Sequence, residues 1–513
     1  MRTLLISPPY PLSEWPTIPI GLGYIAAVLE KNGFEVNVLD LLVSQDSEEK
    51  LYRHMAEFEP EVVGITAVTM NYPFSSNLLR LCKKANDNVI TVIGGPHVTF
   101  CAEQTLNESP WIDIVVRGEG EYTMLDIVGG KEILEIEGIA FRKNGVTTMT
   151  GDRPWIENPD ELPFPARHLF PIPKYLAFSG RCSLITGRGC PFNCIFCLGH
   201  RMVGRRTRLR DPKLVVDEIQ LLQEMGFEDI GIDDDLFTLN HAHVYAICDE
   251  IENRGLKVKW HAFSRVDTVN RELMIRMKQT GCSGLVYGVE SGNQEILDRV
   301  NKKITLEKVK QAVALAKEVG LGVLTSFILG LPGETKETMR QTYNFARELG
   351  VSHGFHVLAP FPGTEVREKA EEYGITILTN DWSKYDANRA VTATADAGPR
   401  EVAEILRQYY SDIKGYTNYQ ESQARKGELT EEEMQEVRLR GQRRFVWKLL
   451  KKDGIENLES LETSDCPTKD LAQRLAEHLS LPIHQTEEQV VRLVSKGLLI
   501  PRMADGCVLW NWS

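Results

Sequence analysis

Three cysteines stand close together in the middle of the chain. Cys190, Cys194 and Cys197 lie in the stretch GRGCPFNCIFC, at C-x3-C-x2-C spacing. A structural zinc site usually takes four ligands, and the nearest further candidates are His200 and Cys182. An iron–sulfur cluster held by only three thiolates would keep one iron open to bind a small molecule. The apolar residues between the cysteines favour the iron–sulfur interpretation, with zinc as the alternative.

The cysteines follow the first strand of a repeating strand–helix pattern. Apolar strands separated by helical segments are expected at 183–190, 229–235, 257–265, 283–292, 322–333 and 352–363. This alternation predicts a partial (β/α)6 TIM-type barrel. The loops that follow the strands carry the chemistry in barrels of this kind, so the cysteine loop stands where an active site is expected.

An earlier pattern of the same kind occupies the first part of the chain. Strands are expected at 2–9, 34–40, 61–68, 88–97 and 113–121, with helical segments between them. They predict an N-terminal doubly wound parallel sheet, Rossmann-like in architecture. Turn-forming stretches follow these strands, at the edge where open α/β sheets bind ligands. No G-x-G-x-x-G with an acidic residue about 20 positions later is present, which disfavours a nicotinamide nucleotide.

These patterns divide the chain into four expected parts. The N-terminal sheet occupies residues 1–145, a proline-rich linker 146–180, and the barrel 181–395. The remaining residues, 396–513, form a mainly helical part. Its final stretch has the pattern of two or three helices followed by a β-wing, as in winged-helix domains, a fold that serves many purposes.

Composition narrows the possible partners and the cellular location. A net charge of −13 argues against a broad nucleic-acid surface, and the basic residues between 438 and 452 fit a solvated helix of mixed charge. No apolar run approaches the roughly 20 residues of a membrane span, and the N-terminus lacks a signal peptide. Ten cysteines without a disulfide pattern suit a reducing compartment. We expect a cytoplasmic protein without a membrane span and without nucleic acid as a partner.

Several motifs resemble the radical S-adenosylmethionine (SAM) superfamily, within its cobalamin-dependent branch. They are the cysteine motif, DDDLFT (233–238), HAFSRVD (261–267), YGVESG (287–292), SFILGLPGE (326–334) and APFPGTE (359–365). The resemblance implies that Cys190, Cys194 and Cys197 hold a [4Fe–4S] cluster whose open iron binds SAM. One-electron reduction by an external donor of the flavodoxin or ferredoxin type would then cleave SAM to a 5′-deoxyadenosyl radical.

The resemblance also implies which residues contact SAM. Asp234 would meet its amino group and Arg265 its carboxylate, and Ser326 replaces a glycine of the strand-five pattern. The implied set is Phe196, Asp234, Arg265, Glu290, Ser291, Ile328 and Leu329. The aspartates at 233–235 have two other interpretations, which are a divalent-cation site and a cap for the following helix.

The N-terminal segments SPPYP, ITAVTMNYP, VIGGPHVT and VVRGEGE resemble the cobalamin-binding domain of the same branch. The contacts implied are Ser7, Pro8, Thr66, Met70, Asn71, Tyr72, Gly94, Gly95, His97, Arg117, Gly118 and Glu119. The D-x-H-x-x-G motif, whose histidine ligates cobalt in other methyltransferases, is absent from the sequence. The resemblance therefore implies cobalt without a histidine ligand. An empty flavodoxin-like domain is the alternative.

The resemblance implies a methyltransferase. It would move a methyl group from methylcobalamin to an unactivated carbon, or to phosphorus, of a small-molecule or natural-product substrate. One SAM would remethylate the cobalamin and a second would supply the radical. Two alternatives remain at this point. One is a cyclase or oxidative rearrangement enzyme of the same branch, and the other is a cobalamin- or redox-sensing regulator.

Overall fold

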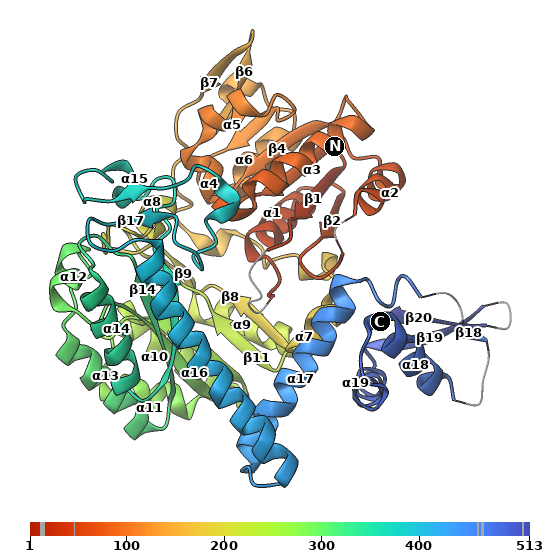
Figure 1. Ribbon diagram of the computed structural model, residues 1–513. Helices are drawn as coiled ribbons and strands as arrows, with labels where there is room; N and C mark the ends of the chain where they lie inside the picture. Colours follow the sequence, from red (N-terminus) through yellow and green to blue (C-terminus); the bar gives the residue numbers. More distant parts are fainter. Residues whose placement is uncertain (11–15, 46, 459–460, 463–465, 505–506) are drawn as a thin grey trace.

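The structure is a computed structural model that describes residues 1–10, 16–45, 47–458, 461–462, 466–504 and 507–513 (Figure 1). Its first sheet has the order β2-β1-β3-β4-β5-β6-β7. The strands are β1 (Thr3–Ser7), β2 (Val36–Asp40), β3 (Val62–Thr66), β4 (Ile90–Gly94), β5 (Ile114–Val116), β6 (Ile139–Lys143) and β7 (Val146–Met149). The first five are parallel, and the strand order reverses between β1 and β3. The five strands predicted from the sequence are therefore all present.

Helices cover both faces of the first sheet. Leu5 packs in one hydrophobic core with α1 (Ile20–Lys31) and α6 (Glu121–Val128). Leu4 and Ile6 pack in another core with α2 (Glu48–Phe58), α3 (Tyr72–Ala85) and α5 (Ala102–Glu108). Successive side chains of a strand point to opposite faces, so the alternation explains how one strand supplies two cores. The predicted doubly wound architecture is confirmed.

The sheet continues past residue 145, where the sequence suggested a linker. β6 and β7 form an antiparallel hairpin at the sheet edge. Its turn is Asn144-Gly145, with φ of 53° and 79°, the combination that favours a tight two-residue hairpin turn. The proline-rich stretch that follows contains α7 (Ile172–Phe178).

The second sheet is a six-stranded parallel sheet with the order β15-β14-β13-β12-β11-β8. Its strands are β8 (Arg181–Leu184), β11 (Asp229–Ile232), β12 (Lys259–Ser264), β13 (Cys282–Glu290), β14 (Gly322–Leu329) and β15 (Ser352–Val357). Helices follow the strands: α9 (Pro212–Glu224), α10 (His241–Asn253), α11 (Arg271–Gln279), α12 (Gln294–Arg299), α13 (Leu306–Val319) and α14 (Lys336–Glu348). This is the predicted partial barrel.

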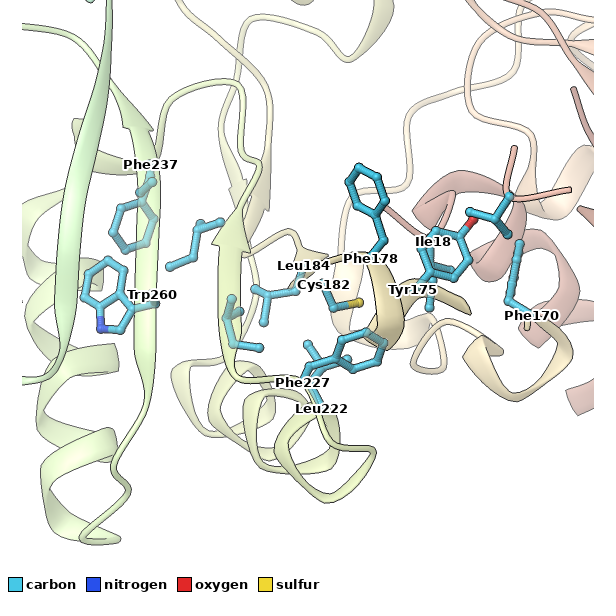
Figure 2. Packing of buried hydrophobic residues seen from close by; sticks show 14 of the residues in the cluster. Ile18, Phe170, Tyr175, Phe178, Cys182, Leu184, Leu222, Phe227, Phe237 and Trp260 are labelled. Carbon is cyan, nitrogen blue, oxygen red and sulfur yellow. The ribbon is translucent and has the colours of Figure 1, made fainter. Parts of the chain in front are cut away.

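Helices cover only the outer face of this second sheet. In the packing of that face, Cys182 and Leu184 of β8 lie next to Leu222 and Phe227 (Figure 2). The rings of Trp260 and Phe237 meet edge to face, with centroids 5.7 Å apart. The sheet is therefore anchored from one side.

Shorter elements connect the two sheets and close the barrel. They are β9 (Gly187–Arg188), β10 (Arg208–Leu209), α4 (Pro96–Phe100), α8 (Gly199–Met202), α15 (Glu365–Glu368), β16 (Thr376–Ile377) and β17 (Thr392–Ala393). Strand β9 pairs with β10 in an antiparallel fashion. This small ladder lies directly before the cysteine loop.

The C-terminal part begins with two long helices, α16 (Pro399–Lys426) and α17 (Glu431–Lys451), that pack on each other (Figure 1). Helix α16 packs on α14, and α17 packs on α7. Then come α18 (Pro467–Leu479), α19 (Ile483–Ser495) and a small sheet of β18 (Leu461–Glu462), β20 (Cys507–Trp512) and β19 (Leu499–Ala504). In the described part of the chain, no helix is both long and apolar enough to span a membrane.

Candidate active site

The cysteine loop runs from β9 to α8 and is held by the backbone on both sides. The N–H of Cys190 donates to the carbonyl of Gly204 (3.1 Å), and the N–H of Ile195 donates to that of Val300 (3.2 Å). Gly189, just before the loop, has φ of 113°, and a Cβ there would stand 2.3 Å from the carbonyl oxygen of Arg206. Only glycine fits this position, so the loop has one defined path.

Positive charge lies next to the cysteines. Burial raises the pKa of the Cys194 thiol, and Lys302 and Arg265 lower it. Cys190 and Cys194 are near enough for the charge of each to affect the pKa of Cys197. Burial raises the pKa of all three thiols, and nearby cations oppose this at Cys190 and Cys194. Such cations suit a cluster that must be bound by thiolates, because they favour the deprotonated form.

The two further candidates for a zinc site lie in other surroundings. Cys182 is buried in the outer core of β8 (Figure 2), where its thiol donates to the carbonyl of Ser183 (3.8 Å). His200 lies in α8, and burial and the neighbouring Arg205 and Arg201 lower its pKa. The surroundings of both therefore favour the three-cysteine interpretation.

Two of the residues implied for SAM lie beside the loop. The Arg265 guanidinium stacks 3.6 Å from the ring centroid of Phe192 and pairs with Asp267 (2.9 Å). Glu290 ends β13 with φ of 73°, and its carboxylate lies 2.7 Å from Lys302 Nζ. Lys302 also offers its carbonyl to Arg265 (2.8 Å). Nothing in the sequence around Lys302 distinguishes it from a surface lysine, and only the fold brings it here.

The other implied SAM residues divide between two environments. Phe196 and Ile328 share an apolar cluster with Val300 and Leu358. Leu329, the next residue of β14, points to the opposite face and is fully buried in the outer core.

Ser291 is engaged by the protein itself. Its hydroxyl bonds to Thr342 Oγ1 (3.1 Å) and accepts from the Asn293 N–H (3.2 Å). These contacts shape the loop after β13.

Asp234 supports the strand-to-loop connection. One carboxylate oxygen accepts from the N–H groups of Thr186 (2.6 Å) and Gly187 (3.2 Å), and the other accepts from the Thr186 hydroxyl (2.5 Å). Burial raises its pKa to about 7. Its neighbours Asp233 and Asp235 line a cavity instead. Asp234 follows β11, and its partners lie in the loop after β8. These contacts fit a structural role in which Asp234 fixes that loop, and not a role as the cap of a following helix.

That cavity, of about 480 Å³, lies between the two sheets. We call it the main cavity. Five of the residues implied for cobalamin line it: Thr66, Gly94, Gly95, Gly118 and Glu119. Its inner end reaches Leu5, Gly64 and Val92 of the first sheet and Met124 of α6, while Ile185, Arg188 and Asp235 come from the barrel. Residues of the first sheet and of the barrel therefore line the same cavity.

A second cavity of about 280 Å³ adjoins the main cavity, since Thr66 and Pro19 line both. It contains three more of the implied residues, Ser7, Pro8 and Asn71. Trp447 of α17 closes its other side. The glycine edges of the main cavity let the backbone approach a large planar ligand, and the apolar inner end suits an aromatic group, so the residues present fit cobalamin.

The remaining residues implied for cobalamin line neither cavity. Burial lowers the pKa of His97 to about 3. Its ring packs against Tyr72 with centroids 4.3 Å apart and meets Trp382 edge to face at 5.0 Å. Met70 is buried, and Arg117 pairs with Asp152 (2.6 Å). His97 is thus a neutral packing residue. Its position in the helical turn of α4, which the sequence motif does not specify, directs it away from the cavity.

A buried network of charges joins the two sheets. We call Glu119, Glu121, Arg188 and Arg208 the Glu–Arg network. Arg188 lies 2.9 Å from Glu119 and 2.6 Å from Glu121, and Arg208 lies 2.9 Å from Glu119. Burial would raise the pKa of Glu119, but Arg208 and Arg188 outweigh it and the pKa is lowered. Sequence reasoning identified only Glu119, because the partners are far away in the chain.

Comparisons with known proteins agree with this geometry. The family model for the B12 binding domain matches residues 13–128, and that for the Radical SAM superfamily matches residues 184–346. The chain is 36% identical over 422 residues to "Uncharacterized methyltransferase PH0819" of Pyrococcus horikoshii, covering 80% of this chain and 92% of that protein. It is 32% identical over 440 residues to the anaerobic magnesium-protoporphyrin IX monomethyl ester cyclase of Rubrivivax gelatinosus, covering 81% and 77%.

A solved structure has the same fold over nearly the whole chain. The cobalamin-dependent SAM radical enzyme OxsB, with aqua-cobalamin and SAM bound, superposes with a TM-score of 0.69 at 16% identity, covering 97% of this chain and 80% of that one. The family models and the extensive sequence identity settle the relationship. The chain therefore belongs to the cobalamin-dependent radical SAM enzymes, whose cofactors are cobalamin, a [4Fe–4S] cluster and SAM.

Proposed function

We propose that this enzyme transfers a methyl group from cobalamin to a small-molecule substrate. One observation carries the proposal: Arg188, two residues before Cys190, lines the main cavity together with Thr66, Gly94 and Gly118 of the first sheet. A corrin in that cavity and a cluster on the cysteine loop would face a common space. Close approach of the reacting partners is what a transfer between them requires.

When bound, the cofactors would supply the difficult chemistry. SAM and the cluster would supply the radical that abstracts hydrogen from the substrate, and methylcobalamin would supply the methyl group. The protein binds and orients them. We assign the cluster to Cys190, Cys194 and Cys197, and the SAM contacts to Phe196, Arg265, Glu290, Ile328 and, in addition, Lys302. We assign cobalamin to the linings of the two cavities. Asp234, Ser291 and Leu329 support these groups from behind.

The chain's own charges suit this assignment. Arg265 and Lys302 offer positive charge beside the cysteines, which favours thiolate ligands and a SAM carboxylate. The mainly apolar lining of the main cavity excludes water from the reacting groups.

An external electron donor of the flavodoxin or ferredoxin type completes the proposal. Cys197 is exposed while Cys194 is buried, so one side of the cluster would be open to a docked reductant. All ten cysteines are free, which supports a reducing, cytoplasmic location.

The name of the Pyrococcus relative supports methyl transfer, and that of the Rubrivivax relative supports a second candidate, cyclisation without methyl transfer. The two can be separated before the substrate is known. The enzyme is purified without oxygen, loaded with iron, sulfide and hydroxocobalamin, reduced, and mixed with SAM. A methyltransferase forms methylcobalamin and S-adenosylhomocysteine. Formation of 5′-deoxyadenosine without the thioether would contradict methyl transfer and favour the cyclase.

A further inference from the structure

The inner face of the barrel sheet carries a row of three apolar side chains, two of which stay exposed among the residues that the structure describes. Phe263 of β12, Val286 of β13 and Leu324 of β14 are lateral neighbours in the strand register. Phe263 is 45% exposed and Leu324 is 41% exposed, although both belong to strands with a neighbour on each side. We call these three residues the apolar row.

The outer face of the same strands shows what a covered position looks like. Trp260, Leu285, Tyr287 and Phe327 occupy the alternate positions and are at most 1% exposed. On the inner face, Gly284, Gly288, Gly322 and Gly354 leave space beside the apolar row, and a Cβ on Gly354 would meet nothing within 4 Å. The inner face beside the row is thus low, while the outer face is filled with large side chains. Polar groups border the row, since His261, two residues before Phe263 on the same face, contacts Asp229 (3.0 Å) and Arg181.

The apolar row continues directly into the proposed SAM site. Two residues further along the strands, the inner face carries Arg265 and Ser326, and two further still it carries Ile328. Glu290 follows a bulge in β13, and its carboxylate lies beside the position that a Cβ of Gly288 would take on this face. Each step of two residues advances about 6.6 Å. The apolar row therefore lies on the same face as the groups that would hold SAM, two to four residues closer to the N-terminal ends of the strands.

The surroundings of the row suit a small molecule better than a macromolecule. Helix α16 packs beside β15, where the Tyr409 hydroxyl donates to the carbonyl of His353 (2.8 Å). Helix α17 packs on α7, where Gln442 donates to the carbonyl of Ala177 (3.4 Å), and α7 in turn packs on the edge strand β8. The helical pair thus borders both edges of the sheet (Figure 1), and a protein surface would have to pass between them to touch the row.

We propose that the apolar row binds the hydrocarbon or aromatic part of the substrate, and that Phe263 and Leu324 determine specificity. This inference rests on the proposed function. The three side chains offer no hydrogen bonds, so a sugar or nucleotide pressed against them would lose its bonds to water without replacement. An apolar group would instead gain from removing their exposed surface from water. The substrate class is therefore one with an apolar body at the reacting end.

Photolabelling tests the inference without knowledge of the substrate. The probe is 3-(trifluoromethyl)-3-phenyldiazirine, a small uncharged aryl compound that inserts into nearby bonds when illuminated. It is applied to enzyme loaded with the cluster, hydroxocobalamin and saturating SAM, and the labelled peptides are identified by mass spectrometry. We expect labelling to be concentrated in residues 259–265 and 322–328.

Substitutions within the apolar row test whether the probe binds there. Phe263→Ser with Leu324→Ser is expected to reduce labelling of these peptides at least fivefold. The control pair, Val146→Ser with Met149→Ser, removes exposed apolar side chains from β7 and should leave the labelling unchanged. Gly354→Leu gives a second route, because it fills the inner face without removing any member of the row, and it should also reduce labelling. Cobalt and iron contents are measured on every variant to verify that it folds.

Two outcomes would overturn the inference. One is labelling of the two peptides no stronger than that of other exposed segments. The other is labelling that SAM abolishes, which would assign the row to SAM instead of the substrate. Formation of S-adenosylhomocysteine is measured on the same samples. Its absence with labelling intact would count against methyl transfer and not against the apolar site.

Discussion

The two sheets of this enzyme offer their ligands different kinds of surface. Helices cover both faces of the first sheet, so the space left for a ligand lies at the strand ends and in a slot beneath α6. Helices cover only the outer face of the second sheet, and its inner face is open over Phe263 and Leu324. A doubly covered sheet encloses a cofactor that stays bound, while a sheet covered on one side leaves a face for molecules that enter and leave.

The largest effect is expected from the cysteine loop, and it tests whether the two regions bind their cofactors independently. In the triple variant Cys190→Ala, Cys194→Ala and Cys197→Ala, the protein should lose all of its about four cluster irons, since no thiolate remains to bind them. Cobalamin should stay bound, because its cavities use other residues. Iron and cobalt are measured by metal analysis after anaerobic loading. Equal loss of both metals would mean that the two regions do not bind independently.

The Glu–Arg network is where the two regions are expected to depend on each other. Arg188→Ala leaves Glu121 buried without its ion-pair partner, and breaking a buried pair costs about 3–5 kcal/mol. We expect a lower melting temperature and weaker retention of cobalamin. The distance between Co(II) and the reduced cluster, measured by pulsed EPR, should also become less uniform.

The matched control for Arg188 is Arg117→Ala. Arg117 lies after β5, on the same connection as Glu119, but its partner Asp152 is exposed, so the loss should stay within about 1 kcal/mol. A change in the cobalt–cluster distance as large as that of Arg188→Ala would refute the positioning role.

Filling the main cavity from the first sheet should weaken the binding of cobalamin. A Cβ at Gly94 would make an ordinary 3.7 Å contact with Val116, so the backbone tolerates a side chain there. In Gly94→Leu the side chain would occupy ligand space, and we expect cobalamin affinity to fall about tenfold, equivalent to about 1.4 kcal/mol. Absorption titration measures it, with Gly415→Leu in the exposed part of α16 as control. Unchanged affinity would mean that cobalamin does not use this edge.

A pH comparison separates two buried carboxyl groups. Glu119 has arginine partners, whereas the carboxylate of Glu334, after β14, accepts from the N–H groups of Gly330 (2.6 Å) and Leu331 (3.0 Å). Burial raises the pKa of Glu334 from 4.5 to about 8. Between these values the folded protein binds more protons than the unfolded chain, so stability falls as pH rises, by about 1.4 kcal/mol per pH unit.

Glu334→Gln should remove this dependence, because the amide keeps the oxygen that accepts both N–H groups and does not titrate. The melting temperature of the wild type should drop more between pH 6 and pH 8 than that of the variant. Parallel curves for the two proteins would show that Glu334 is already ionised at pH 6.

The sequence predicted the strand pattern well, because buried parallel strands read as apolar runs and the glycine-rich turns mark their ends. It also located the cysteine loop, which is local in the chain. It missed the hairpin of β6 and β7, although Asn144-Gly145 is a recognised turn signal. Strand β7 after the turn has only four residues, VTTM, and gives little periodicity.

The side chains of the site were harder to predict, because a motif does not specify which way each one points. Three consecutive aspartates read alike, yet Asp234 turns into the loop after β8 while Asp233 and Asp235 face the main cavity. The Glu–Arg network joins residues 89 positions apart, and no local pattern links them. Lys302 likewise reaches the cysteines only through the fold.

The Glu–Arg network also has a consequence for synthesis on the ribosome. The first sheet is complete once Met149 has emerged, but Glu119 receives Arg208 only 59 residues later, by subtraction of the two positions. At about 5–20 residues per second this interval lasts about 3–12 s. Until residue 188 emerges Glu119 has neither arginine partner, and until residue 208 emerges it has only Arg188. The order of translation thus leaves the charge network that joins the two sheets incomplete until residue 208 emerges.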